Sequence, residues 1–146
     1  MGRIVVGVDG SKGSLAALAW AIEEASFRKA TVVAVEAWLP YSSVSPLETM
    51  APVFQQNEGE AIAKGALSES VERIKGDSDV VIEQQVLCDH PVSALLEVSK
   101  GADLLVVGSR GHGGFLGLAL GSVSSQCVHH ATCPVVVIRE QEEARK

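Results

Sequence analysis

The chain has 146 residues, of which 47% are hydrophobic and 21% charged, and this composition predicts one folded domain with a sizeable core and excludes a disordered chain. Twelve basic residues against eighteen acidic ones give a net charge of −6, which argues against a general role on nucleic acid or on an anionic membrane. Three cysteines without a CxxC pair, and no apolar stretch near the roughly 20 residues that a membrane helix needs, indicate a cytoplasmic protein.

Strand and helix patterns alternate along the first half of the chain. The β-branched run at residues 4–8 predicts a strand buried on both faces, and residues 12–29 have helical spacing after a cap at Ser11 or Ser14. The residues expected on the buried face of that helix are Leu15, Leu18, Ala19, Ile22 and Ser26. Residues 31–38 predict a second strand, and three prolines without a clear period predict a loop at 39–52.

The second half continues the alternation. Residues 54–76 predict a long helix, 80–88 a third strand, and 91–100 a helix that starts at Pro91 and is capped by Gly101. Residues 103–108 predict a fourth strand, 109–121 a glycine-rich loop, 122–131 a helix, 134–139 a last strand and 140–146 a charged tail. This order predicts an α/β fold in which residues 1–146 form a single doubly wound domain, with a five-stranded parallel sheet and helices on both faces.

Glycines cluster where the fourth predicted strand ends. Six of the fourteen glycines lie between residues 108 and 121, and this segment leads into a helix that starts at Ser122. Glycine allows the backbone to approach a phosphate closely, and the N–H groups of a helix N-terminus attract anions. The cluster therefore favours phosphate binding, while a flexible lid or a set of tight turns stays open, and Ser122 can bind phosphate or cap the helix. Neither the Walker A nor the Rossmann glycine pattern is present.

Asp9 comes directly after the first predicted strand. Ligands of open parallel sheets bind at the carboxyl ends of the strands, so Asp9 can contact a ligand there or form only an Asx turn. Arg110 can pair with a phosphate or lie in solvent. His112 can reach a phosphate, but we expect no catalytic role for it. Cys127 and His130 share a helical face, but no further ligands follow at zinc-site spacing, so we expect no metal site there.

The spacing Gly108-x2-Gly111-x9-Gly121-Ser122 is similar to the glycine motif of ATP-binding universal stress proteins. Residues 4–11, 104–111, 121–131 and 133–137 also resemble that family, and the similarity covers nearly the whole chain apart from about 40–58 and the tail. The resemblance implies an adenine nucleotide α-hydrolase-like fold with strand order 3-2-1-4-5. It also implies a cytoplasmic stress-response protein that binds ATP together with Mg²⁺ or Mn²⁺.

The resemblance further implies which residues form the site. Asp9 contacts the nucleoside, Gly7 and Val8 line the same pocket, and Ala34 makes a main-chain contact to adenine. The residues implied around the phosphates are Gly108, Gly111, Gly121, Ser122 and Val123. Because phosphoryl transfer needs positioned charge and the glycine loop contains no lysine, slow ATP hydrolysis is the most that we expect.

The last predicted strand, which contains Val135, Val136 and Val137, lies at an edge of the sheet in this strand order. A bare apolar edge pairs readily with another strand, which predicts a homodimer through this strand unless the tail covers it. Three other functions stay open: an interaction module that binds no nucleotide and acts by dimerising, a true ATPase or kinase-like enzyme, and a cyclic-nucleotide binder.

Overall fold

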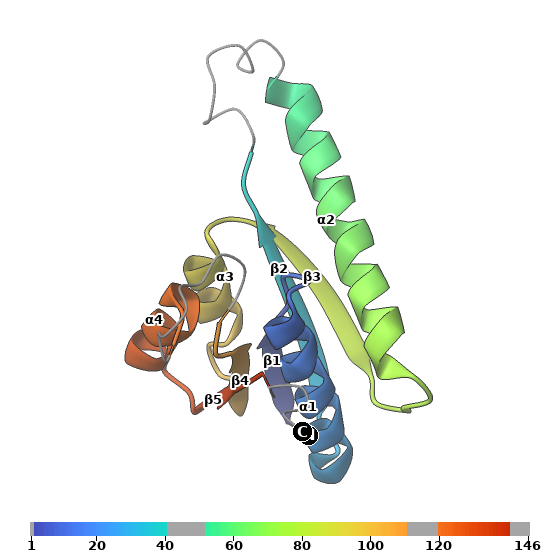
Figure 1. Ribbon diagram of the computed structural model, residues 1–146, viewed down its shortest axis with the longest axis vertical. Coiled ribbons are helices and arrows are strands. Elements are labelled where there is room, and N and C mark those ends of the chain that lie inside the picture. Colours follow the sequence, from blue (N-terminus) through green and yellow to red (C-terminus); the bar gives the residue numbers. More distant parts are fainter. Residues whose placement is uncertain (1, 41–51, 111–119, 141–146) are drawn as a thin grey trace, which may run out of the picture.

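The computed structural model describes residues 2–40, 52–110 and 120–140. In these residues strands and helices alternate in the predicted order (Figure 1). The elements are β1 (Arg3–Gly7), α1 (Lys12–Arg28), β2 (Thr31–Trp38), α2 (Pro52–Lys75), β3 (Ile82–Cys88), α3 (Pro91–Val98), β4 (Leu104–Gly108), α4 (Ser122–His130) and β5 (Val135–Ile138). The predicted boundaries agree with these within about two residues, and Pro91 begins α3 as expected.

The strands form one parallel sheet of five strands in the order β3-β2-β1-β4-β5. The predicted α/β fold class and strand order are therefore confirmed. The central strand β1 is held on both sides, because Val5 pairs with Val33 of β2 and with Leu105 of β4. Every strand connection crosses over through a helix, as parallel pairing requires.

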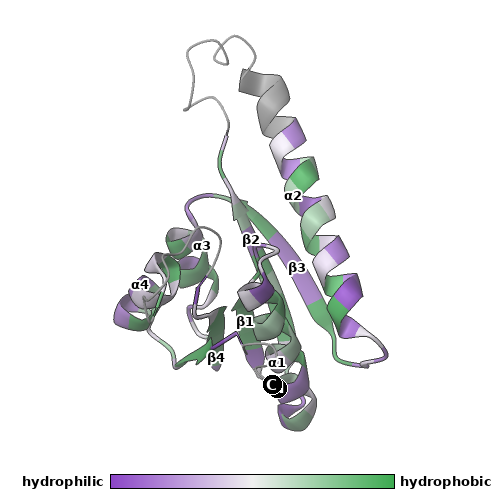
Figure 2. Ribbon diagram, viewed as in Figure 1, coloured by the Kyte–Doolittle hydropathy of each residue, from purple (hydrophilic) through white to green (hydrophobic). Residues whose placement is uncertain are grey.

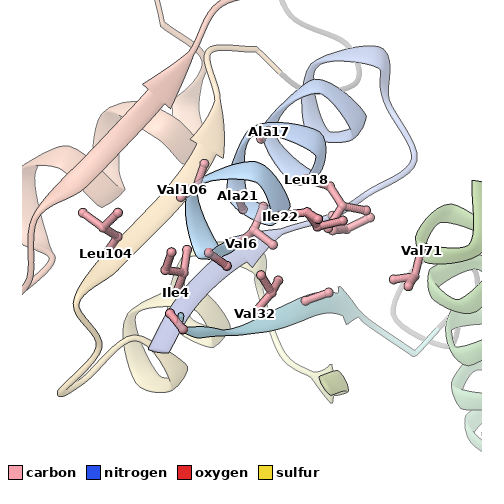
Figure 3. Close-up of a cluster of buried hydrophobic side chains, with 14 of the residues drawn as sticks. Ile4, Val6, Ala17, Leu18, Ala21, Ile22, Val32, Val71, Leu104 and Val106 are labelled. Carbon is pink, nitrogen blue, oxygen red and sulfur yellow. The ribbon is translucent and has the colours of Figure 1, made fainter. Parts of the chain in front are cut away.

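Helices cover both faces of the sheet, α1 and α2 on one side and α3 and α4 on the other (Figure 1). Each face has its own hydrophobic core. Ile4, Val6 and Val106 point toward α1 (Figure 3). Val5 and Leu105 belong to the core on the side of α3 and α4, since successive strand residues alternate between faces. Burial of each such side chain contributes about 1.5–3 kcal/mol to folding before entropy is subtracted.

The buried face of α1 differs from the predicted one. Leu18 and Ile22 are buried as expected, but Ala19 and Ser26 are exposed and Leu15 is only half-buried. The residues of α1 that pack inward are Gly13, Ser14, Ala17, Leu18, Ala21, Ile22 and Ala25. This face is rich in small side chains, which bring the helix backbone close to the sheet. A prediction guided by the largest apolar residues therefore places the centre of the face too far round the helix.

The end of α3 also differs from the prediction. Ser99, with helical backbone angles, is the C-cap, and Gly101 lies two residues later with φ +78°. The side chain of Arg3 donates hydrogen bonds to the carbonyls of Val98 and Lys100, at 2.8 and 2.7 Å. Since these carbonyls lie at the helix terminus, the cation also opposes the negative end of the helix dipole.

The two edges of the sheet have different characters. At one edge β3 exposes Glu83, Gln84 and Gln85, which appear as a polar stretch in Figure 2. At the other edge, all four residues of β5 are apolar and half-buried. Among the helices that the structure describes, none is both long and apolar enough to cross a membrane.

Candidate functional site

The candidate site lies at the carboxyl edge of the sheet, where β1 and β4 end side by side. From β1 the chain crosses to β2 on one side, and from β4 it crosses to β5 on the other, so the strand order reverses between them. Ligands of open α/β sheets bind at such a point. The end of β1 is fixed to β2 by the Val8 N–H, which donates to the Val35 carbonyl at 2.8 Å.

A closed network of hydrogen bonds shapes the turn after β1. The Asp9 carboxylate accepts from the Ser11 N–H at 2.9 Å and from the Ser11 hydroxyl at 2.6 Å. The Ser14 hydroxyl accepts from the Asp9 N–H and donates to the Ser11 carbonyl, both at 3.1 Å. Ser11 is the N-cap of α1, its hydroxyl accepting from the Ser14 N–H. The Asx turn is thus present, and it holds an exposed Asp9 in a defined position.

The start of α1 touches the end of β4 through two glycines. A Cβ on Gly108 would lie 2.7 Å from both the carbonyl carbon and the carbonyl oxygen of Gly13. A Cβ on Gly13 would lie 2.6 Å from the Arg110 carbonyl oxygen. Only glycine fits at either position, so the turn at Asp9 and the first residues after β4 are held against each other. Gly13 was missed from the sequence, where one glycine inside a helix pattern gives no distinctive signal.

The two ends of the glycine-rich segment meet at a neck, which we define as Ser109, Gly121 and Ser124. The Ser109 carbonyl accepts from the Gly121 N–H at 2.6 Å and from the Ser124 hydroxyl at 2.8 Å. The Ser109 N–H donates to the carbonyl of Ile138 in β5 at 2.8 Å. The neck brings the N-terminus of α4 to the end of β4, next to the turn at Asp9.

The N-terminus of α4 is suited to an anion. Gly121 is the N-cap and has no side chain with which to satisfy the first N–H groups, and the first turn contains no acidic residue. Since Gly121 occupies the cap, the alternative in which Ser122 caps the helix is wrong, and Ser122 is exposed at the first helical position. Val123 packs its side chain against the core on the α3 side, so a ligand at this helix terminus would meet its main chain rather than its side chain.

The structure brings most of the predicted site residues to this edge, but not all of them. Gly7 ends β1 and faces α3, where a Cβ would lie 3.0 Å from Leu95 Cδ1. Val8 is buried in the core, and Arg110 is half-buried beside the neck. Ala34 lies inside β2, fully buried and paired with Val6, below the end of β1. Gly111 and His112 lie outside the described residues.

Few groups near this edge could hold a metal ion. Within residues 2–40, 52–110 and 120–140 no cluster of three or more His, Cys, Asp or Glu side chains is placed to bind one. Cys127 is fully buried, and its burial, with a smaller contribution from Cys133, raises the pKa of its thiol to about 11. The Nδ1–H of His129 donates to the Ser125 carbonyl, 2.8 Å away, and the His129 ring lies beside that of His130. A cation at the site would therefore rely on Asp9 and on oxygens of the ligand itself.

Known proteins resemble this chain over nearly its whole length. The model of the universal stress protein family matches residues 1–139. A universal stress protein of Mycobacterium tuberculosis is 41% identical over 143 residues, and one of Mycolicibacterium smegmatis is 38% identical over 138 residues. Each alignment covers 93% of this chain, but only 43% and 45% of the relatives. The chain thus spans less than half the length of these relatives.

Solved structures show the same fold. The universal stress protein UspA from Lactobacillus plantarum is 26% identical, with a TM-score of 0.80, and the match covers 94% of this chain and 97% of that one. A universal stress protein solved in complex with cAMP is 29% identical, with a TM-score of 0.70 over 96% of this chain and 98% of that one. With its fold and the family match over residues 1–139 in agreement, the chain belongs to the universal stress protein family.

Proposed function

We propose that this protein binds adenine nucleotides, ATP foremost, at the carboxyl edge between β1 and β4. The observation that carries the proposal is the neck, in which the Gly121 N–H donates to the Ser109 carbonyl at 2.6 Å. This bond sets a helix N-terminus that has no side-chain cap at the end of β4. Main-chain N–H groups and the positive end of a helix are the groups that bind phosphate. The family relative in complex with cAMP supports an adenine nucleotide as the ligand.

The two ends of the nucleotide would meet different chemistry. The phosphates would lie on the neck and the first N–H groups of α4, with Arg110 near them. The nucleoside would lie toward β1 and β2, where the Asp9 carboxylate is held by Ser11 and can accept from ribose hydroxyls. A main-chain contact at Ala34 would require the ligand to reach a buried strand position, so Val35, level with Gly7, offers the nearer part of β2.

A divalent cation, Mg²⁺ or Mn²⁺, would accompany a bound triphosphate. The residues present fit such an ion only in part, because Asp9 is the carboxylate that directly follows β1, and the remaining ligands would be phosphate oxygens and water. Bound in this way, the ion would neutralise phosphate charge. Without further positioned cations, the site would hydrolyse ATP slowly at most.

The test is direct identification of the nucleotide. The purified protein is denatured, small molecules are separated and identified by mass, and titration calorimetry with ATP and Mg²⁺ measures the affinity. In Gly121→Val, a β-branched side chain at the N-cap would obstruct the approach of phosphate, and we expect binding to be lost. Gly65→Ala is the matched control, since a Cβ there has no neighbour within 4 Å.

Two results would change the proposal. If the wild type neither contains nor binds an adenine nucleotide, the better supported function is an interaction module that binds no nucleotide and acts by dimerising. Since a relative is solved with cAMP, titration with cAMP beside ATP separates a cyclic-nucleotide binder from an ATP binder. Tighter binding of cAMP than of ATP would indicate that the natural ligand is a cyclic nucleotide with a single phosphate.

A further inference from the structure

The hydroxyl of Ser124 is placed to control how the two ends of the glycine-rich segment meet. It donates to the Ser109 carbonyl at 2.8 Å and lies 3.2 Å from the Gly121 carbonyl. One proton is therefore shared between acceptors at the two ends of the segment. Ser124 and Ser109 are 2% and 5% exposed, so water cannot easily replace either partner.

We infer that Ser124 is a positioning residue for the phosphates of the ligand, an inference that rests on the proposed nucleotide binding. In this proposal Ser124 does not contact the phosphates itself, and it acts through the backbone that its hydroxyl holds in place. Its hydroxyl fixes the distance between the end of β4 and the first turn of α4, and these two segments carry the N–H groups proposed to bind phosphate. Small errors in such a distance weaken binding strongly, since each N–H must reach its oxygen at hydrogen-bond length.

The nucleoside end of the site is held by other bonds. The turn at Asp9 is fixed by Ser11 and Ser14, whereas the Ser124 hydroxyl bonds the carbonyls of Ser109 and Gly121. Loss of the Ser124 hydroxyl should therefore lower the affinity for nucleotides that carry phosphates and leave the affinity for adenosine unchanged. A residue that merely stabilised the fold would not separate the two.

The experiment measures the dissociation constants of ATP, AMP and adenosine for four proteins: wild type, Ser124→Ala, Ser124→Cys and Ser125→Ala. Ser125→Ala makes the same chemical change one residue away on α4, where no side-chain hydrogen bond is present in the described residues. We expect Ser124→Ala to lose about tenfold in affinity for ATP, the size of one buried hydrogen bond. Adenosine affinity should change less than about twofold, well inside the free energy of one such bond.

Each result decides a different point. A loss that grows from adenosine to AMP to ATP in Ser124→Ala, absent in Ser125→Ala, supports the inference. An unchanged ATP affinity, or an equal loss for adenosine and ATP, overturns it while the proposed function stands. If the wild type binds none of the three, the proposed function itself fails. Should Ser124→Ala not fold, judged by circular dichroism, Ser124→Cys keeps the volume with a weaker donor and takes its place in the comparison.

Discussion

Four buried serines shape the backbone at the carboxyl edge of the sheet, namely Ser11, Ser14, Ser109 and Ser124. Three of them use their hydroxyls to bind main-chain or carboxylate groups of the turn at Asp9 or of the neck, and Ser109 uses its peptide. A buried polar group that loses its partner costs about 1–3 kcal/mol. At the scale of single residues, the geometry of the site is therefore set by hydroxyls as much as by glycines.

Cys127 is the residue whose ionisation the fold changes most clearly among the described groups. Burial raises the pKa of its thiol from 9.0 to about 11, so the unfolded chain loses this proton first as pH rises. The free energy of unfolding should then fall between pH 9.0 and about 11. Urea unfolding across this range measures the slope. Cys127→Ala should remove this part of the slope, whereas Cys88→Ala, at an exposed thiol, should keep it; equal slopes in wild type and Cys127→Ala would contradict the assignment.

At the scale of elements, the close contact of α1 with β4 joins the two halves of the site. The contact depends on Gly13 and Gly108, whose backbones meet without room for a Cβ. It also explains why the buried face of α1 includes Gly13, Ala17, Ala21 and Ala25 besides its larger residues. Small residues allow the helix to lie close enough to the sheet for its first turn to reach the end of β4.

The contact can be tested by comparing two glycine substitutions. Gly108→Ala should lower the free energy of unfolding by about 1–3 kcal/mol, because the new methyl group meets backbone that has little freedom to move. Gly65→Ala, at an open position in the middle of α2, should raise it by about 0.5–1 kcal/mol through helix propensity. Urea unfolding followed by circular dichroism measures both. A Gly108→Ala protein as stable as wild type would show that α1 and β4 are less tightly packed at this point.

The sequence carries most of the information about elements and much less about contacts between them. Apolar runs and helical spacing predict each strand and helix, because burial imposes those periods locally. The glycine cluster at 108–121 also predicts where the candidate site lies, because such a high local glycine content is unusual. Gly13 and Ser124 have no such signal, because their roles arise from partners that lie elsewhere in the chain, at Gly108 and Ser109 respectively. Their contribution follows only from the assembled sheet.

At the scale of the whole molecule, the two edges of the sheet differ in how readily they can pair with another strand. The β3 edge presents Glu83, Gln84 and Gln85, and polar or charged residues on an edge strand oppose pairing. The β5 edge is a run of Val135 to Ile138 in which no charge interrupts the apolar side chains. We propose that a second copy of the chain pairs along β5. The Ser109 N–H, which donates to the Ile138 carbonyl, places this strand in contact with the neck of the candidate site.

Sedimentation equilibrium tests the dimer by comparing the wild type with two variants, each of which has one lysine substituted on a different edge strand. The wild type should have twice the mass of a single chain. Val137→Lys should sediment as a monomer, because a charged side chain on β5 would meet the partner strand, and Gln85→Lys on β3 should remain a dimer. Circular dichroism checks that Val137→Lys is folded, since Val137 also packs against the core and its replacement must extend toward solvent. A monomeric wild type, or a Gln85→Lys protein that dissociates while Val137→Lys does not, would exclude β5 as the pairing edge.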